Sequence, residues 1–179
     1  QEDAIFAVLE NETDKRRNKA ELRALFYLGA YTGQRMKDCA LLQWHSVDLN
    51  RRRINVKQFK TGKEATIPIA PQLFDVLTEA WEWKSNIYVL PNISRRYRKK
   101  NDKGKDVGSA LVNLDVLRVI KAAGISTNQK VPGRKRAVTV YGFHSLRHAF
   151  VSFCAERGVP KAVVVSILGA DSKIIDKYY

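Results

Sequence analysis

The sequence predicts a mainly α-helical fold with one small antiparallel β-sheet, an α+β class. Apolar residues recur at helical spacing along most of the chain, whereas only one pair of short alternating segments flanks a glycine-containing turn. The 179 residues, 45% hydrophobic and 28% charged, are enough for one domain with a buried core. Neither an internal repeat nor a Gly/Ser linker divides the chain, so we predict a single domain over residues 1–179.

The predicted helices are defined by apolar stripes and by residues that start or end a helix. Leu22, Leu25, Phe26 and Gly29 form the clearest stripe, and a Thr-Gly pair ends that helix. Pro71 opens a later helix, since proline is favoured in a first turn. The predicted helices cover residues 2–9, 20–31, 35–44, 71–84, 109–123, 144–156 and 160–168.

The predicted sheet comes from two segments, 53–59 and 65–70, in which apolar and polar residues alternate. The turn between them, residues 60–63, has the sequence Lys-Thr-Gly-Lys, with a glycine where positive φ is needed. The remaining predictions are a short strand at 87–90 and two basic loops at 94–107 and 127–136.

The charge balance predicts a polyanionic partner. There are 32 lysines and arginines against 18 acidic residues, which gives a formal net charge of +14. Nucleic acid is the first candidate and an anionic membrane surface the second. No apolar run approaches the roughly 18–20 residues that span a bilayer, so we expect no membrane partner. Cys39 and Cys154 lie far apart in apolar helical patterns and are expected to be separate buried thiols in a reducing compartment.

Three separated motifs carry the residues from which chemistry is expected. In residues 32–38, Thr-Gly-Gln-Arg-Met-Lys-Asp, an arginine follows a glycine at the start of a helix. Residues 144–148, His-Ser-Leu-Arg-His, place two histidines and an arginine along one side of a helix start. The C-terminal residues 174–179 end in two tyrosines.

In this order, the motifs resemble those of the tyrosine recombinases, the phage integrase family, and the resemblance runs from about residue 20 to residue 179. Residues 33–38 resemble the first arginine box, and residues 144–148 the second, His-x-Leu-Arg-His. The turn at 60–63 resembles the catalytic-lysine turn of the family. The segment Ile-Leu-Gly at 167–169 resembles the family's Leu-Gly-His, with the nucleophile nine positions past the histidine, a spacing that selects Tyr179 over Tyr178.

The resemblance implies the catalytic-domain fold of that family and a reaction that needs no metal and no cofactor. Tyr179 would attack a DNA phosphodiester, giving a 3′-phosphotyrosine and a free 5′-hydroxyl. Arg35 and Arg147 would hold the non-bridging oxygens, because a guanidinium fork matches them in charge and geometry. Lys60 would protonate the departing 5′-oxygen, and His144 would bind the phosphate or take the tyrosine proton.

Three further positions have supporting roles by the same resemblance. Asp38, one helical turn past the first arginine, is expected to orient a guanidinium, and His148 to support the site from behind. Ala170 stands where the family has His or Trp, and an alanine cannot donate a hydrogen bond to a phosphate oxygen. This departure predicts attenuated cleavage. Choosing Lys60 rather than Lys63 as the general acid follows the family position.

Double-stranded DNA is the implied partner, together with further protomers that assemble from dimers to tetramers on paired sites. The resemblance also implies an amino-terminal DNA-clamping domain, a cytoplasmic location on host DNA and an origin in a mobile element. The chain opens without a methionine or a secretory signal, and we expect it to be part of a longer protein. Nine basic residues are expected to contact the DNA backbone: Lys63, Arg95, Arg96, Arg98, Lys99, Lys100, Arg134, Lys135 and Arg136.

Other functions stay open at this point. A DNA-binding module of the same fold with little or no catalysis is favoured by Ala170. A type IB topoisomerase-like enzyme shares the nucleophile and the arginines, but would act as a monomer. His144 and His148 have the i, i+4 spacing of metal ligands on a helix. Because no glutamate follows His144 and no third Cys, His or carboxylate cluster lies nearby in the sequence, we predict no metal site.

Overall fold

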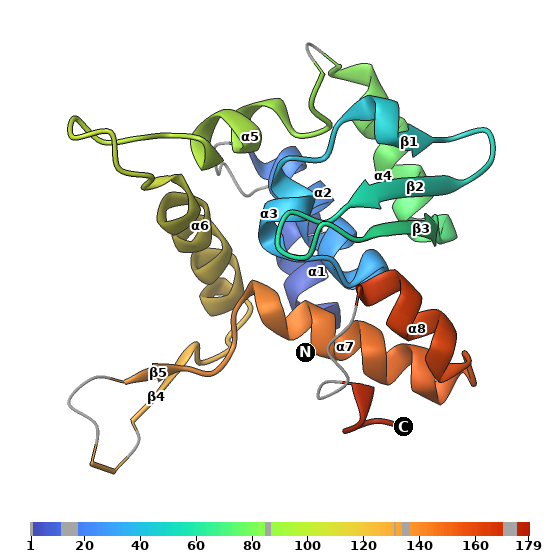
Figure 1. Cartoon of the computed structure of the whole chain (residues 1–179). Coiled ribbons are helices and arrows are strands. Elements are labelled where there is room, and N and C mark those ends of the chain that lie inside the picture. The colour runs from blue at the N-terminus through green and yellow to red at the C-terminus, as the bar shows by residue number, and fades with distance from the viewer. Residues whose placement is uncertain (1, 12–17, 85–86, 131, 134–136, 170–174) are drawn as a thin grey trace.

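The computed structural model describes residues 2–11, 18–84, 87–130, 132–133, 137–169 and 175–179 (Figure 1). The helices are α1 (Glu2–Glu10), α2 (Lys19–Thr32), α3 (Met36–Ala40), α4 (Pro71–Glu82), α5 (Pro91–Tyr97), α6 (Gly108–Ala122), α7 (Phe143–Glu156) and α8 (Lys161–Leu168), with a 3-10 turn, η1 (Trp44–Ser46). The strands are β1 (Val47–Asp48), β2 (Arg53–Lys57), β3 (Glu64–Pro68), β4 (Asn128–Gln129) and β5 (Val138–Thr139). A mainly helical fold with small antiparallel sheets is therefore confirmed.

Helix α2 is the centre of the core, because it contacts α1, α3, α4, α5 and α7. Leu25 and Phe26, on the predicted apolar stripe, are fully buried. Gly29 on the same stripe faces α7, where Phe143 and Leu146 pack against its backbone. The absence of a side chain at Gly29 therefore lets α2 and α7, which carry the flanks of the two arginine motifs, approach each other closely.

Replacing Gly29 with alanine tests this approach. A methyl group there would lie 2.6 Å from Cζ of Phe143 and 2.8 Å from Cδ1 of Leu146. We expect Gly29→Ala to lower the free energy of unfolding by about 1–3 kcal/mol through overpacking. That loss would come despite the gain of roughly 1 kcal/mol that alanine gives over glycine inside a helix. Urea unfolding followed by circular dichroism measures it, and an equal or higher stability would contradict the close approach.

The predicted hairpin is confirmed as β2 and β3 of a three-stranded antiparallel sheet in the order β1-β2-β3. Ile54 pairs with Ile67 and Val56 with Ala65, and all four side chains are buried. Gly62 has a φ of 68° in the turn, and its amide donates to the carbonyl of Gln58 at 2.8 Å. This turn extends from the buried part of the sheet and carries the lysines of the predicted catalytic-lysine motif.

The helix predicted at 35–44 is shorter in the structure, where α3 ends at Ala40. The following backbone pairs with a distant segment instead: Val89 N donates to Leu42 O and Trp44 N to Ile87 O, both at 2.9 Å. The strand predicted at 87–90 is correspondingly reduced to an isolated antiparallel bridge between Gln43 and Tyr88. This long-range pairing ends the helix, and local periodicity contains no information about it.

Both basic loops contain regular structure that the sequence did not predict. The loop prediction for 94–107 was wrong at its start, because α5 covers residues 91–97. The carboxylate of Glu21, which is buried on α2, accepts hydrogen bonds at 2.9 Å from the backbone amides of Asn92 and Ile93 and so caps α5. The loop prediction for 127–136 was wrong at residues 128–129, where β4 pairs with β5 in a hairpin that stands apart from the helices in Figure 1.

The two cysteines are free and buried, as predicted. Burial is the main cause that raises the pKa of both thiols. Among the described residues, no helix combines the length and the apolar character needed to cross a membrane.

Candidate functional site

Arg35 stands at the turn between α2 and α3, where Gly33 reverses the chain with a φ of 62°. The arginine is half-buried, and its Nη1 atom is buried without a hydrogen-bond partner among the described residues. It lines a cavity of about 450 Å³ together with Asn113 of α6 and His144 and His148 of α7. A guanidinium that borders an open cavity is suited to bind an anion.

His144 lies in the first turn of α7, one helical turn before His148. Their rings meet edge to face with centroids 5.4 Å apart. Burial is the main cause that lowers the pKa of His144. The other causes are positive charges close enough to act on it, those of His148, Arg147, Arg35 and Lys60. Arg35 and His144, from the two arginine motifs, thus line one cavity, and the charge of Lys60 has only the smallest of these effects on the histidine.

Arg147 is buried, with only 3% of its surface exposed. Its Nη1 donates to the carbonyl of Gly33 and its Nη2 to the carbonyl of Leu168, both at 2.8 Å. The side chain therefore ties α7 both to the turn that precedes Arg35 and to the end of α8. The motif pattern gave no indication of these two hydrogen bonds to backbone carbonyls.

Lys60 is exposed at the turn of the β2–β3 hairpin. The preceding backbone amide, that of Phe59, donates to Oδ1 of Asp38 at 2.9 Å. Asp38 itself is buried, with 4% of its surface exposed. The motif predicts that this carboxylate orients a guanidinium, but its contact in the structure is with the backbone of the lysine hairpin.

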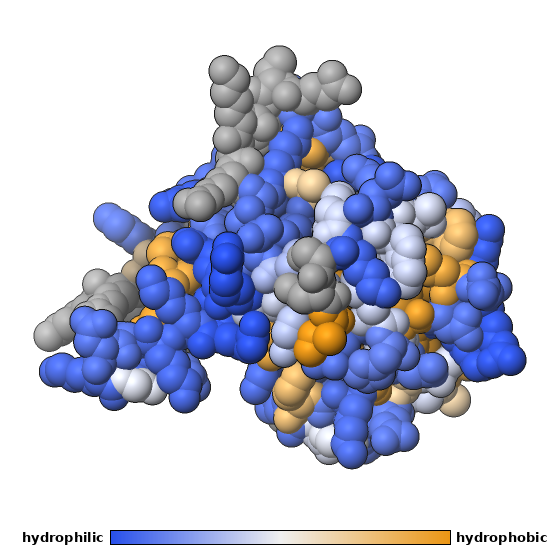
Figure 2. All heavy atoms as spheres, turned by 90° about the horizontal axis from the view of Figure 1, so that it is seen from above, coloured by the Kyte–Doolittle hydropathy of each residue, from blue (hydrophilic) through white to orange (hydrophobic). Residues whose placement is uncertain are grey.

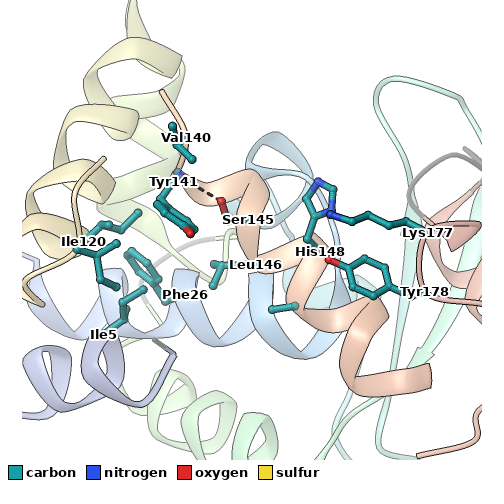
Figure 3. Close-up of a pocket in the computed structure, with 13 residues that line it drawn as sticks. Ile5, Phe26, Ile120, Val140, Tyr141, Ser145, Leu146, His148, Lys177 and Tyr178 are labelled. Carbon is teal, nitrogen blue, oxygen red and sulfur yellow. Dashed lines mark hydrogen bonds between the residues drawn. The ribbon is translucent and has the colours of Figure 1, made fainter. Parts of the chain in front are cut away.

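The two C-terminal tyrosines point to different places. The hydroxyl of Tyr179 donates to the carbonyl of Val159 at 2.6 Å, in the turn between α7 and α8. Partial desolvation, followed by the nearby Cys154, raises the pKa of this phenol. Tyr178 instead lines a cavity of about 540 Å³ with Lys177 and His148, and Figure 3 shows these three side chains grouped at one end of it. In this arrangement Tyr178 lies at the cavity that His148 lines, and Tyr179 lies against the α7–α8 turn.

The basic residues predicted to contact DNA differ in how much the fold uses them. Nε of Arg96 pairs with Asp115 of α6 at 2.8 Å, and the guanidinium of Arg98 lies over the ring of Tyr88. Nη2 of Arg95 donates to Oδ1 of Asn92 at 2.8 Å. All of the described members except Arg96 are exposed: Lys63, Arg95, Arg98, Lys99 and Lys100. Figure 2 shows that the surface on the face it presents is mostly hydrophilic. Four predicted residues lie outside the described part of the chain: Arg134, Lys135, Arg136 and Ala170.

Buried amides near the site were missed by the motif analysis. Gln58 is 1% exposed and Gln34 3% exposed, and the two side chains hydrogen-bond each other. One sequence pattern indicates Gln58: it follows Ile54 and Val56 on the inward phase of the β2 alternation. Among the described residues, no group of three or more His, Cys, Asp or Glu side chains is placed to hold a metal ion.

Comparison with known proteins gives a family match and a curated relative. The family model described as the phage integrase family matches residues 1–179. A tyrosine recombinase XerC-like protein of Caldanaerobacter subterraneus subsp. tengcongensis is 24% identical over 177 residues, which cover 83% of this chain and 42% of the relative. The chain therefore spans less than half the length of that curated relative.

Solved structures with this fold are 19–20% identical to the chain. The XerH recombinase bound to difH substrate gives a TM-score of 0.69 over 99% of this chain and 48% of that one. XerA recombinase gives 0.67 over 99% and 57%. The lambda integrase catalytic core gives 0.63 over 96% and 92%, so its boundaries are close to those of this chain. With the family match over the whole sequence, the chain belongs to the phage integrase family of tyrosine recombinases.

Proposed function

We propose that this chain is the catalytic domain of a site-specific DNA recombinase that cuts and rejoins DNA through a 3′-phosphotyrosine. The observation that carries the proposal is the open cavity lined by Arg35 and His144, with the charges of Lys60 and Arg147 near enough to act on the pKa of that histidine. A guanidinium and a histidine at one cavity suit a phosphodiester on which negative charge grows during attack.

The proposed reaction begins with in-line attack of the Tyr179 oxygen on phosphorus. The guanidinium groups of Arg35 and Arg147 stabilise the non-bridging oxygens. Because the pKa of His144 is lowered, its imidazole is neutral at pH 7 and can accept the tyrosine proton. Lys60 gives a proton to the 5′-oxygen as the P–O5′ bond breaks. The phosphotyrosine ester keeps the bond energy for rejoining, so neither ATP nor a metal ion is required.

We infer that double-stranded DNA is the partner and that two to four protomers act on paired sites. Related structures support this: XerH is seen bound to difH substrate, and lambda integrase as a dimer on a COC′ core site and as a tetramer on a Holliday junction. The exposed Lys63, Arg95, Lys99 and Lys100 are proposed backbone contacts. An amino-terminal DNA-clamping domain, a mobile-element origin and action on host DNA in the cytoplasm complete the proposal.

A DNA-binding module with reduced catalysis is the second candidate, because Ala170 replaces a hydrogen-bond donor of the family. Covalent trapping on supercoiled plasmid and candidate attachment-site DNA separates the two. We expect the chain to form an SDS-resistant protein–DNA adduct, and Ala170→His to raise its rate at least about tenfold, since one transition-state donor is commonly worth 10²–10³. Ala170→Leu is the matched control, because it adds bulk without a donor. No adduct from either the chain or Ala170→His, on DNA that both bind, would leave the binding module as the function.

A further inference from the structure

Two glutamine side chains form a buried junction beside the site. Nε2 of Gln58 donates to Oε1 of Gln34 at 2.9 Å and to the carbonyl of Ile167 at 3.2 Å. Nε2 of Gln34 donates to the same Ile167 carbonyl at 2.9 Å and to that of Thr32 at 3.2 Å. Buried carboxamides are uncommon and unfavourable unless they are hydrogen-bonded, and here both are. We call this pair the amide clasp.

The amide clasp joins the segments that carry the proposed phosphate-binding arginine and general acid. Gln34 directly precedes Arg35, and Gln58 lies two residues before Lys60. Three residues past Arg35, Asp38 accepts a hydrogen bond from the Phe59 amide at 2.9 Å. The α2–α3 turn and the lysine hairpin are thus held together at two points, which lie on either side of Arg35 and directly before Lys60.

The hairpin tip and the residue that follows α8 both pack tightly against Gln58 of the amide clasp. The hydroxyl of Thr61, at the hairpin tip, donates to Oε1 of Gln58 at 2.9 Å. A Cβ on Gly169, just past α8, would lie 2.1 Å from that same Oε1, so only glycine fits there. With its donors and its acceptor engaged, Gln58 has one orientation, and the hairpin tip has a defined place relative to α8.

We propose that Gln58, together with Gln34, is a positioning residue that sets the Lys60 hairpin against Arg35 so that the lysine ammonium meets the departing 5′-oxygen. The inference rests on the proposed recombinase function and names a role beyond its motif residues. An exposed lysine on a two-stranded turn is otherwise free to move, and a misplacement of about 1 Å can cost on the order of 10² in rate.

A DNA substrate with a different leaving group separates the positioning of Lys60 from other effects on the rate. In a duplex with sulfur in place of the bridging 5′-oxygen, the departing thiolate needs no proton, because a thiol is far more acidic than an alcohol. Nucleophilic attack and charge stabilisation by the arginines remain the same in kind. Loss of general-acid positioning therefore slows the oxygen duplex selectively, whereas general damage to the site slows both.

The experiment measures the rate of SDS-resistant adduct formation on matched oxygen and sulfur duplexes of a sequence that the unaltered chain cleaves. We expect Lys60→Ala and Gln58→Met to lower the rate of adduct formation on the oxygen duplex, Gln58→Met by about 10- to 100-fold. On the sulfur duplex, the rate for each variant should stay within about threefold of the rate for the unaltered chain. Thr61→Val should act in the same direction, more weakly. Thr66→Val is the matched control, since its hydroxyl bonds Asn55 on the exposed face of the same hairpin; both rates should stay unchanged.

The ratio of the two rates within one preparation does not depend on the fraction of folded protein, so a destabilised Gln58→Met remains informative. Two results would overturn the positioning role and leave the recombinase function standing. In the first, Gln58→Met or Lys60→Ala lowers the adduct rate equally on both duplexes. In the second, Gln58→Met leaves the adduct rate on the oxygen duplex unchanged. Absence of any adduct from the unaltered chain on either duplex removes the recombinase function, and this inference with it.

Discussion

Tyr179→Phe is expected to abolish the SDS-resistant DNA adduct while DNA affinity stays within about twofold. The substitution removes the attacking oxygen and keeps the ring. It also removes the hydrogen bond to the Val159 carbonyl, an exposed contact worth about 1 kcal/mol, so the fold should persist. Denaturing gel electrophoresis with labelled duplex measures the adduct, and mobility shift measures binding at one fixed salt concentration, because affinity for DNA falls steeply with salt.

Tyr178→Phe is the matched control, since it removes the neighbouring hydroxyl from the cavity with His148. Its adduct should form at close to the unaltered rate. The reverse pattern, with the adduct kept in Tyr179→Phe and lost in Tyr178→Phe, would move the nucleophile to the tyrosine beside the histidine pair. In that case the nine-residue spacing typical of the family would not hold for this chain.

Arg147→Met is expected to lower the free energy of unfolding by about 3 kcal/mol as well as the adduct rate. The buried guanidinium donates two charge-assisted hydrogen bonds, and its loss leaves the carbonyls of Gly33 and Leu168 without these donors. Urea unfolding monitored by circular dichroism gives the stability, and single-turnover trapping gives the rate.

Arg35→Met provides the contrast. Because Nη1 of Arg35 has no partner among the described residues, we expect a loss of about 10²–10³ in adduct rate with stability changed by less than roughly 1 kcal/mol. If Arg147→Met were as stable as the unaltered chain, its two carbonyl contacts would not hold the site together. If Arg35→Met were strongly destabilised, its proposed task would be structural.

The parts of the fold that the sequence predicted are those with a strong local pattern. The stripe of α2 and the alternation of β2 and β3 each reflect burial of one face, and both are visible within a few residues. Helix α5 was missed because its N-terminus is capped by Glu21, 71 residues away from Asn92. The shortened α3 was missed for the same kind of reason, a pairing of Leu42 with Val89.

The candidate site was predictable to a similar degree. The motifs pointed to Arg35, His144 and Lys60, and in the structure Arg35 and His144 line one cavity. Residue types alone did not indicate that Arg147 donates to two backbone carbonyls, because those carbonyls belong to distant turns. The separate placement of Tyr178 and Tyr179 was also unpredictable, since it depends on which side of α7 each side chain reaches.

The contact at Gly29 has a consequence for how such domains diverge. The spacing between Arg35 and His144 depends on two helices that meet where a methyl group is missing, and not on the long stretch of chain that connects them. Insertions or deletions in the loops around α5, α6 and the β4–β5 hairpin can therefore change the length of the connecting chain without moving Arg35 relative to His144. Relatives are free to exchange those loops while the separation between Arg35 and His144 is kept.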